Sequence, residues 1–243
     1  MPLATVTWGT GDGPRALLVH GITSSAATMW ELGEGLAAAG WVITAVDLPG
    51  HGASPTADSY RFVDVADTIA AQVGDGFDLY VGHSLGGAVG TALLARHPGV
   101  AREVVLLDPA LFAPDDRVRD IPDRLVADKA LGVDEVAAAH PRWHPDTVAA
   151  RVEATAAADV DAVRRWLGDN SPWDVTELAA GVAVPVRVLV SSSESAVAPF
   201  LLDSLPAANP RWSFETVADT THSLHRDRPA EVLARVLAFA GTA

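Results

Sequence analysis

Ser84 lies at the centre of a Gly-x-Ser-x-Gly pattern, in which residues 82–86 read Gly-His-Ser-Leu-Gly. An apolar run that ends at Val81 precedes the pattern, and helical spacing follows it from Ala88 to Arg96. A strand, a tight glycine turn and a helix in this order raise the serine hydroxyl above the end of a sheet, with the next backbone N–H groups facing the same space. This context predicts that Ser84 is a nucleophile rather than a chance serine in a turn.

The segments around this turn alternate between short apolar runs and helical patterns. Such an alternation predicts a mostly parallel sheet with right-handed crossovers. Short apolar runs with few polar residues are typical of strands that are buried on both faces. The expected strands are residues 4–8, 16–20, 41–46, 79–81, 104–107, 184–190 and 212–217, and the expected helices are residues 26–39, 62–73, 88–96 and 229–239.

Residues 113–173 have a different character. This stretch is rich in Ala, Asp and Arg, contains no obvious strand and is interrupted by several prolines. We interpret it as a helical cap inserted after the strand at 104–107. Trp143, Trp166 and Trp173 lie in this stretch, where they would either form an apolar substrate wall or pack the cap helices onto the core.

Four segments together resemble the α/β-hydrolase family, and they occur in the family's order. They are Leu-Leu-Val-His-Gly-Ile at 17–22, the stretch 46–54, the serine turn, and Thr-His-Ser-Leu-His at 221–225. The resemblance implies a mostly parallel sheet flanked by helices, with a core formed by residues 1–111 and 176–243 and a helical cap at 112–175. Residues 47–54 resemble a loop that is mainly structural in this family.

A serine hydroxyl is a weak nucleophile at neutral pH, so it needs a base within hydrogen-bonding reach. His222 is the expected base, because it follows the last expected strand and precedes the last helix, where this family places its histidine. His225 lies nearer the start of that helix and is expected to brace the loop.

The carboxylate that would orient the histidine has two candidates. The resemblance favours Glu194, which ends the sequence Ser-Ser-Ser-Glu after the strand at 184–190, although the usual glycine is absent and Glu is longer than the usual Asp. Asp108 is the alternative, because it follows the strand at 104–107, where haloalkane dehalogenases and some lactone hydrolases are similar in placing their acid. Both loops end at the same edge of the sheet. We prefer Glu194 by a narrow margin.

An oxyanion hole needs N–H donors aimed at the developing negative charge. The N–H of Leu85 follows the nucleophile directly, and the resemblance implies the N–H of Ile22 as the second donor. The adjoining substrate pocket is expected to include four residues, with Ser24 and Met29 as further candidates. The four are His20, Gly21, Thr23 and His83.

The bulk composition limits the possible classes of function. The chain has 243 residues, 49% of them apolar, which suits one α/β domain with an insertion. Its net charge of −14 disfavours nucleic acid and anionic membranes as partners. The absence of cysteine excludes disulfide and thiolate chemistry. No targeting signal or apolar stretch of membrane-spanning length is evident, so we expect a cytoplasmic protein, a monomer or a homodimer.

Cofactors and metals are not expected. His140 and His144 have a spacing of four residues, but Pro141 interrupts the helix and no acidic third ligand is evident. No phosphate-binding glycine loop or dinucleotide motif is present.

The resulting hypothesis is a cofactor-independent serine hydrolase acting on a small carboxylic ester or lactone. Hydrolysis of a carbon–carbon bond or a lyase reaction on the same fold is the alternative among enzymes. A small-molecule receptor with slow turnover is the alternative outside them. An Asp-nucleophile hydrolase is disfavoured, because serine occupies the nucleophile position.

Overall fold

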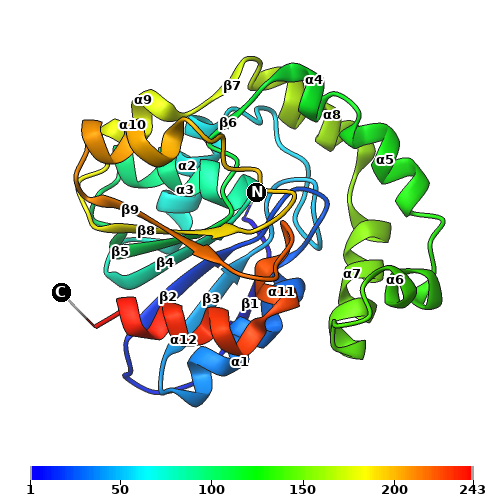
Figure 1. Cartoon of the computed structure of the whole chain (residues 1–243), viewed down its shortest axis with the longest axis horizontal. Helices are drawn as coiled ribbons and strands as arrows, with labels where there is room; N and C mark the ends of the chain where they lie inside the picture. Colours follow the sequence, from blue (N-terminus) through cyan, green and yellow to red (C-terminus); the bar gives the residue numbers. More distant parts are fainter. Residues whose placement is uncertain (1, 242–243) are drawn as a thin grey trace.

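A sheet of seven strands forms the centre of the computed structural model, which describes residues 2–241 (Figure 1). The strand order is β1-β3-β2-β4-β5-β8-β9, with β1 antiparallel to β3 and the other pairs parallel. This architecture confirms the expected α/β class. The strands are β1 (Thr5–Trp8), β2 (Arg15–Val19), β3 (Val42–Val46), β4 (Phe77–His83), β5 (Ala101–Leu107), β8 (Val186–Ser191) and β9 (Trp212–Val217).

Helices cover both faces of this sheet. The helix α2 shows why, because Phe62, Val65, Ala66 and Ile69 recur at helical spacing and are all buried against the sheet. One face carries α2 (Phe62–Val73), α3 (Leu85–Arg96), α9 (Thr176–Ala180) and α10 (Leu201–Ala208). The other face carries the 3₁₀ turn η1 (Ala26–Met29), α1 (Trp30–Ala38), α11 (Leu224–Asp227) and α12 (Pro229–Phe239).

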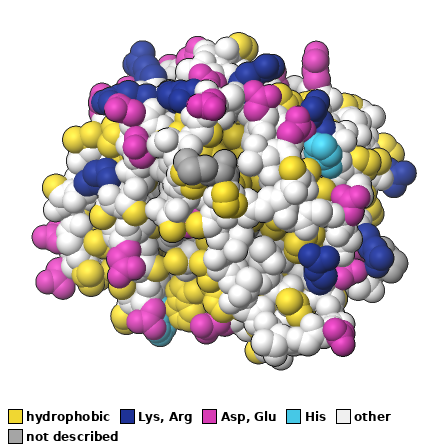
Figure 2. Space-filling view, turned by 180° about the vertical axis from the view of Figure 1, so that it is seen from behind, with side chains coloured by type: hydrophobic (Ala, Val, Ile, Leu, Met, Phe, Trp, Pro, Cys, Tyr) yellow, Lys and Arg dark blue, Asp and Glu magenta, His cyan; other side chains and the backbone are white. Residues whose placement is uncertain are grey.

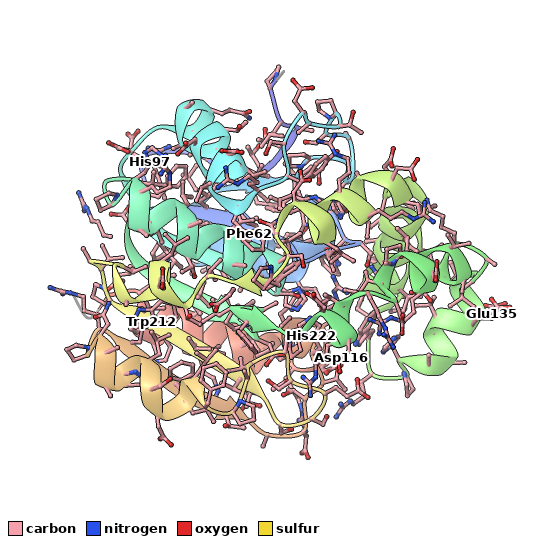
Figure 3. All side chains as sticks on the ribbon, turned by 90° about the horizontal axis from the view of Figure 1, so that it is seen from above. Phe62, His97, Asp116, Glu135, Trp212 and His222 are labelled. Atoms are coloured by element: carbon pink, nitrogen blue, oxygen red, sulfur yellow. The ribbon has the colours of Figure 1, made fainter. Side chains whose placement is uncertain are left out.

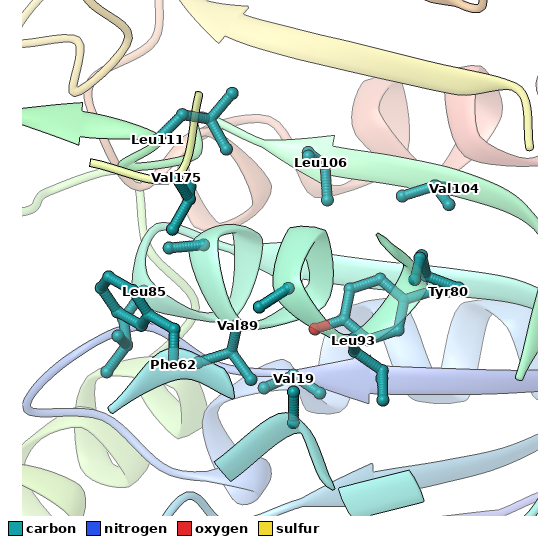
Figure 4. Packing of buried hydrophobic residues seen from close by; sticks show 14 of the residues in the cluster. Val19, Phe62, Tyr80, Leu85, Val89, Leu93, Val104, Leu106, Leu111 and Val175 are labelled. Atoms are coloured by element: carbon teal, nitrogen blue, oxygen red, sulfur yellow. The ribbon is translucent and has the colours of Figure 1, made fainter. Parts of the chain in front are cut away.

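The helix α3 lies inside the core, because every residue from Leu85 to Leu94 is buried. Val89 and Leu93 on this helix belong to the main core cluster, to which both strands and helices contribute side chains (Figure 4). A Cβ atom at Gly90 would lie 2.2 Å from the ring of Tyr80, so the helix approaches β4 more closely than a larger residue allows. This packing fixes the start of α3, where the serine turn lies.

The segment between β5 and β8 carries a helical insertion, which we define as residues 114–172. It contains α4 (Asp115–Val118), α5 (Ile121–Asp128), α6 (Val133–Ala139), α7 (Pro145–Ala157) and α8 (Val160–Asp169), and it arches over one end of the sheet in Figure 1. The strands β6 (Phe112–Ala113) and β7 (Trp173–Asp174) pair at its base. This short pair was not expected, since two residues give no periodicity to read. The boundaries of a separate cap unit at 112–175 remain a prediction.

The insertion is unevenly packed. On α8, Ala162 and Trp166 belong to the main core cluster. By contrast, Leu125 and Val136, on α5 and α6, belong to two small clusters of their own. The side of the insertion near α8 is therefore anchored, whereas α5 and α6 have little apolar support.

The surface mixes both signs of charge. In the view from behind, Asp and Glu side chains are spread around the face and alternate with Lys and Arg along its upper margin (Figure 2). Large exposed apolar side chains occur on the insertion, at Val126, Leu131 and Val133, and on α10 and the turn before it, at Leu202 and Phe200. Within residues 2–241, no helix combines the length and the apolar character that crossing a membrane requires.

Candidate active site

Ser84 lies at the sharp turn between β4 and α3, with φ 51° and ψ −112°. A residue with a side chain rarely adopts a positive φ, so the surrounding packing must hold this strained geometry. Two glycines permit it. A Cβ atom at Gly82 would lie 2.5 Å from the carbonyl oxygen of Gly86, and a Cβ atom at Gly86 would lie 2.2 Å from the carbonyl oxygen of Val19. The predicted serine turn is therefore present, with its hydroxyl at the end of the sheet.

His222 connects this serine to a carboxylate. Its Nε2 atom lies 2.9 Å from the Oγ atom of Ser84, and its Nδ1 atom lies 2.7 Å from the Oδ2 atom of Asp108. An ionised carboxylate only accepts hydrogen bonds, so Nδ1 carries the proton and Nε2 is free to accept the serine proton. Figure 3 shows His222 from above, between the sheet domain and the insertion.

The Asp108 carboxylate is fully buried at the end of β5 and surrounded by donors. The backbone N–H of Ser191 and the hydroxyl of Ser195 donate to Oδ1 at 3.0 and 2.7 Å, and the N–H of Ala196 donates to Oδ2 at 2.8 Å. Burial alone would raise the pKa of this carboxyl, but the hydrogen bonds from His222 and these donors outweigh it and keep the pKa below its usual value. Asp108 is thus held as an anion beside the imidazole.

The narrow preference for Glu194 as the partner of His222 is wrong. Glu194 is exposed at the mouth of the pocket, with φ 53°, and the hydrogen bond to the imidazole comes from Asp108 instead. The physical reason lies at the end of β8 and in the loop that follows. The N–H of Ser191, which ends β8, points at Asp108, and so do the Ser195 hydroxyl and the N–H of Ala196 in the loop. This segment therefore supplies donors to the carboxylate instead of supplying the carboxylate itself.

Two further histidines pack behind the base. The His83 ring lies 4.8 Å from the His222 ring and 4.6 Å from the His225 ring, measured between centroids. The Nε2 atom of His83 donates to the carbonyl oxygen of His222 at 2.9 Å. Burial lowers the pKa of both His83 and His225 well below the usual value, and both stay neutral. The packing is consistent with a bracing role for His225.

A pocket of about 780 Å³ opens above Ser84 and His222. Thr23 and His83 line it as expected, together with Ser24. The expectation that His20 and Gly21 line it is wrong, because both are buried and neither is among the residues that line the pocket.

His20 has a structural role. It is fully buried, its Nε2 atom accepts from the N–H of Leu48 at 3.0 Å, and its Nδ1 atom donates to the carbonyl of Gly21 at 2.7 Å. Gly21 passes close to the nucleophile, since a Cβ atom there would lie 3.1 Å from the Cβ atom of Ser84. Met29, the other candidate, is buried in the core cluster on the face of the sheet that carries α1 and α12, and it does not line the pocket.

The loop that carries Ile22 is held by the segment 47–54. The Nε2 atom of His51 accepts from the N–H of Thr23 at 3.0 Å, and an Asp47 oxygen accepts from the N–H of Ala26 at 2.6 Å. These contacts give the segment the structural role expected from the sequence. They leave Ile22 lining the pocket beside Ser84, and Leu85 as the first residue of α3.

The three insertion tryptophans divide between the two roles that the sequence left open. Trp143 lines the pocket, and its Nε1 atom donates to Asp227 at 2.8 Å. Trp166 and Trp173 are buried in the main core cluster instead. Sequence reasoning missed the arginines that line the pocket, because they come from separate elements and share no spacing. These are Arg117, Arg124, Arg151 and Arg226.

Comparisons with known proteins agree with this geometry. A model of the alpha/beta hydrolase family matches residues 16–236. The chain is 37% identical over 123 residues to lipase LipV of Mycobacterium tuberculosis, a match covering 49% of this chain and 46% of the lipase. It is 44% identical over 92 residues to the pimeloyl-[acyl-carrier protein] methyl ester esterase of Neisseria meningitidis serogroup C, covering 38% of this chain and 34% of the esterase.

The matched segments thus cover less than half of these relatives. Among solved structures, E-2-(acetamidomethylene)succinate hydrolase superposes with a TM-score of 0.81 at 24% identity, covering 98% of this chain and 94% of that chain. This likeness shows the fold. Since the family model spans nearly the whole chain and the serine turn is formed, the chain belongs to the alpha/beta hydrolase family.

Proposed function

We propose that the protein is a serine hydrolase that needs no cofactor and cleaves small carboxylic esters or lactones. The observation that carries the proposal is the chain of hydrogen bonds from Asp108 through His222 to Ser84, at 2.7 and 2.9 Å, at the base of an open pocket. The two relatives described above are named a lipase and a methyl ester esterase, and these names support carboxylic esters as the substrate class.

The proposed reaction proceeds in two halves. The Ser84 oxygen attacks the carbonyl carbon while His222 Nε2 takes the hydroxyl proton, and the tetrahedral oxyanion accepts hydrogen bonds from the N–H groups of Leu85 and Ile22. His222 then gives its proton to the leaving alkoxide, which leaves an acyl-serine. Water attacks this ester with His222 as base, and collapse of the second intermediate releases the acid and restores Ser84.

Active-site labelling tests the proposal directly. A fluorophosphonate should add once to the native protein at Ser84 and not to the Ser84→Ala variant, as intact-mass spectrometry would show. Turnover of 4-nitrophenyl acetate by the native protein, absent from the variant, would distinguish an enzyme from a receptor with the same fold. Equal labelling of both proteins would refute the assignment of the nucleophile.

A further inference from the structure

The pocket is cationic in a strongly acidic protein. The chain has a net charge of −14, yet among the described residues the pocket is lined by four arginines and two carboxylates, those of Asp128 and Glu194. Arg117 and Arg124 lie on the exposed side of α4 and α5, near the mouth. Arg151 on α7 and Arg226 on α11 lie deeper. The inner pair is therefore the better candidate for a binding site.

Arg226 is a buried cation that forms no direct ion pair within residues 2–241, although Asp227 and Glu31 attract it from a greater distance. Its residue is 4% exposed, and its NH2 group donates to the hydroxyls of Ser24 and Thr28 at 3.0 and 3.1 Å. Within residues 2–241, its Nε atom is buried and has no hydrogen-bond partner. The neighbouring carboxylate, Asp227, is engaged elsewhere, because its oxygens accept from Trp143 and Thr221. Two neutral hydroxyls and the Trp143 ring, whose centroid lies 5.2 Å from the guanidinium carbon, thus solvate a charge that usually requires an anion.

Arg151 reaches the same loop from the helix α7 of the insertion. It donates to the carbonyl and hydroxyl oxygens of Thr23, the residue next to the Ser24 that Arg226 contacts. Its side chain is 20% exposed, and the Asp128 carboxylate near it lies 3.9 Å away and is 44% exposed. Burial, followed by repulsion from Arg151, lowers the pKa of Arg226 to about 9. Two like charges are held by the neighbouring residues Thr23 and Ser24, and both arginines line the pocket.

We propose that the substrate carries a carboxylate and that Arg151 and Arg226 bind it. A guanidinium presents a planar fork of N–H donors that matches the two oxygens of a carboxylate, and an anion between the two arginines would relieve both the desolvation and the repulsion. A singly charged group suits the site better than a phosphate dianion, because Asp128 and Glu194 line the same pocket. This inference rests on the proposed function, since the carboxylate would belong to the ester being cleaved.

Matched substrates give the test. Mono-4-nitrophenyl glutarate and 4-nitrophenyl pentanoate share a leaving group and an acyl chain of equal length, and only the glutarate carries a terminal carboxylate. The measured quantity is the ratio of kcat/KM for the charged ester to that for the neutral one. A second pair, 4-acetoxybenzoate and its methyl ester, places the charge on the leaving group.

We expect native protein to prefer the charged member of at least one pair. Arg151→Gln and Arg226→Gln should lower that ratio by about tenfold or more, because each removes one cation from the carboxylate. Arg226→Lys should restore part of it. Arg164→Gln is the matched control, since Arg164 is exposed on α8, pairs with Asp161 at 2.7 Å and does not line the pocket. Ratios in both pairs that neither pocket substitution changes would overturn the inference while leaving the hydrolase proposal intact.

A binding measurement separates the two proposals if no ester is turned over. Calorimetric titration with glutarate and with neutral glutaramide needs no catalysis. Tighter binding of glutarate, weakened by Arg151→Gln, would support the carboxylate site even if the hydrolase proposal failed. Equal affinity for glutarate and glutaramide would overturn it. Circular dichroism of each variant shows whether it is folded. If Arg226→Gln does not fold, the effect of Arg151→Gln on glutarate binding alone tests the carboxylate site.

Discussion

The hydroxyl of Ser195 donates a hydrogen bond of 2.7 Å to Oδ1 of Asp108, across 87 residues of sequence. The same hydroxyl accepts from the N–H of Val197 at 3.1 Å, so its proton is directed at the carboxylate. Ser195 therefore acts on the histidine through Asp108, as a positioning residue.

Ser195→Ala should lower kcat by about tenfold, because a hydrogen bond to a charged group contributes roughly 1.5–3 kcal/mol and only part of it supports the transition state. KM should change little. The acidic limb of the kcat–pH profile should move to higher pH, since the carboxylate would lose a donor that stabilises its charged form. Ser195→Thr, which retains a hydroxyl, is the control. An unchanged profile in Ser195→Ala would contradict this role.

The two candidate acids should behave very differently. Asp108→Asn should reduce kcat by about 10³–10⁴-fold, by analogy with other triads, because an amide leaves the imidazole in the wrong tautomer. Glu194→Gln should cost less than about tenfold, because an exposed carboxylate contributes only diffuse electrostatics. Steady-state kinetics on one ester decides the matter. A more severe loss in Glu194→Gln than in Asp108→Asn would contradict the hydrogen-bond pattern described above.

Acid should destabilise the fold through its buried histidines. Burial lowers the pKa of His20 to about 4 and that of His51 to about 3, from an unfolded value of 6.5. Well above pH 6.5, His20 and His51 are neutral in the folded and in the unfolded state. As the pH falls below that value the unfolded state takes up protons first, so stability is lost towards the folded pKa values. Each such histidine should contribute a slope of about 1.4 kcal/mol per pH unit.

Urea unfolding at pH 7, 6 and 5 would measure this slope. We expect His51→Asn to reduce it, even if the variant is less stable at every pH. His144→Asn is the control, because its side chain is 52% exposed. A free energy of unfolding that stays constant between pH 7 and 5 would exclude the proposed protonation linkage.

Local opening should be unequal along the insertion. On α8, Trp166 is fully buried and Asn170, just after the helix, donates to the carbonyl of Tyr60 at 2.8 Å. The helix α4 has no buried residue, and α6 has only Val136. Amide hydrogen exchange should therefore be fast in α4 and α6 and slow in α8, with β4 slower than all of them. Uniform protection across residues 114–172 would contradict this gradient.

The sequence predicts the sheet and the serine turn well, because both have local causes. The glycines at 82 and 86 and the apolar run before them act within a few residues of Ser84. The acid was harder to predict, because Asp108 and Glu194 both follow strands that end at the same edge. The choice depends on long-range contacts, such as Ser191 and Ser195 donating to Asp108.

The pair of arginines in the pocket could not be predicted from neighbouring residues in the sequence, because it too depends on long-range contacts. Arg151 and Arg226 lie 75 residues apart by their numbering, on elements whose packing determines whether they meet. Short elements such as α11 and the β6–β7 pair were also missed, since a single turn or two paired residues carry no period.

One carboxylate joins the histidine loop to the insertion. Asp227 accepts from the backbone and hydroxyl of Thr221, the residue before His222, and from the indole of Trp143 between α6 and α7. Any displacement of Trp143 removes a donor from the group that anchors the histidine loop. Asp227 therefore couples Trp143, which lines the pocket, to the loop that carries His222. The position of the imidazole that accepts the Ser84 proton thus depends on the position of this part of the pocket lining.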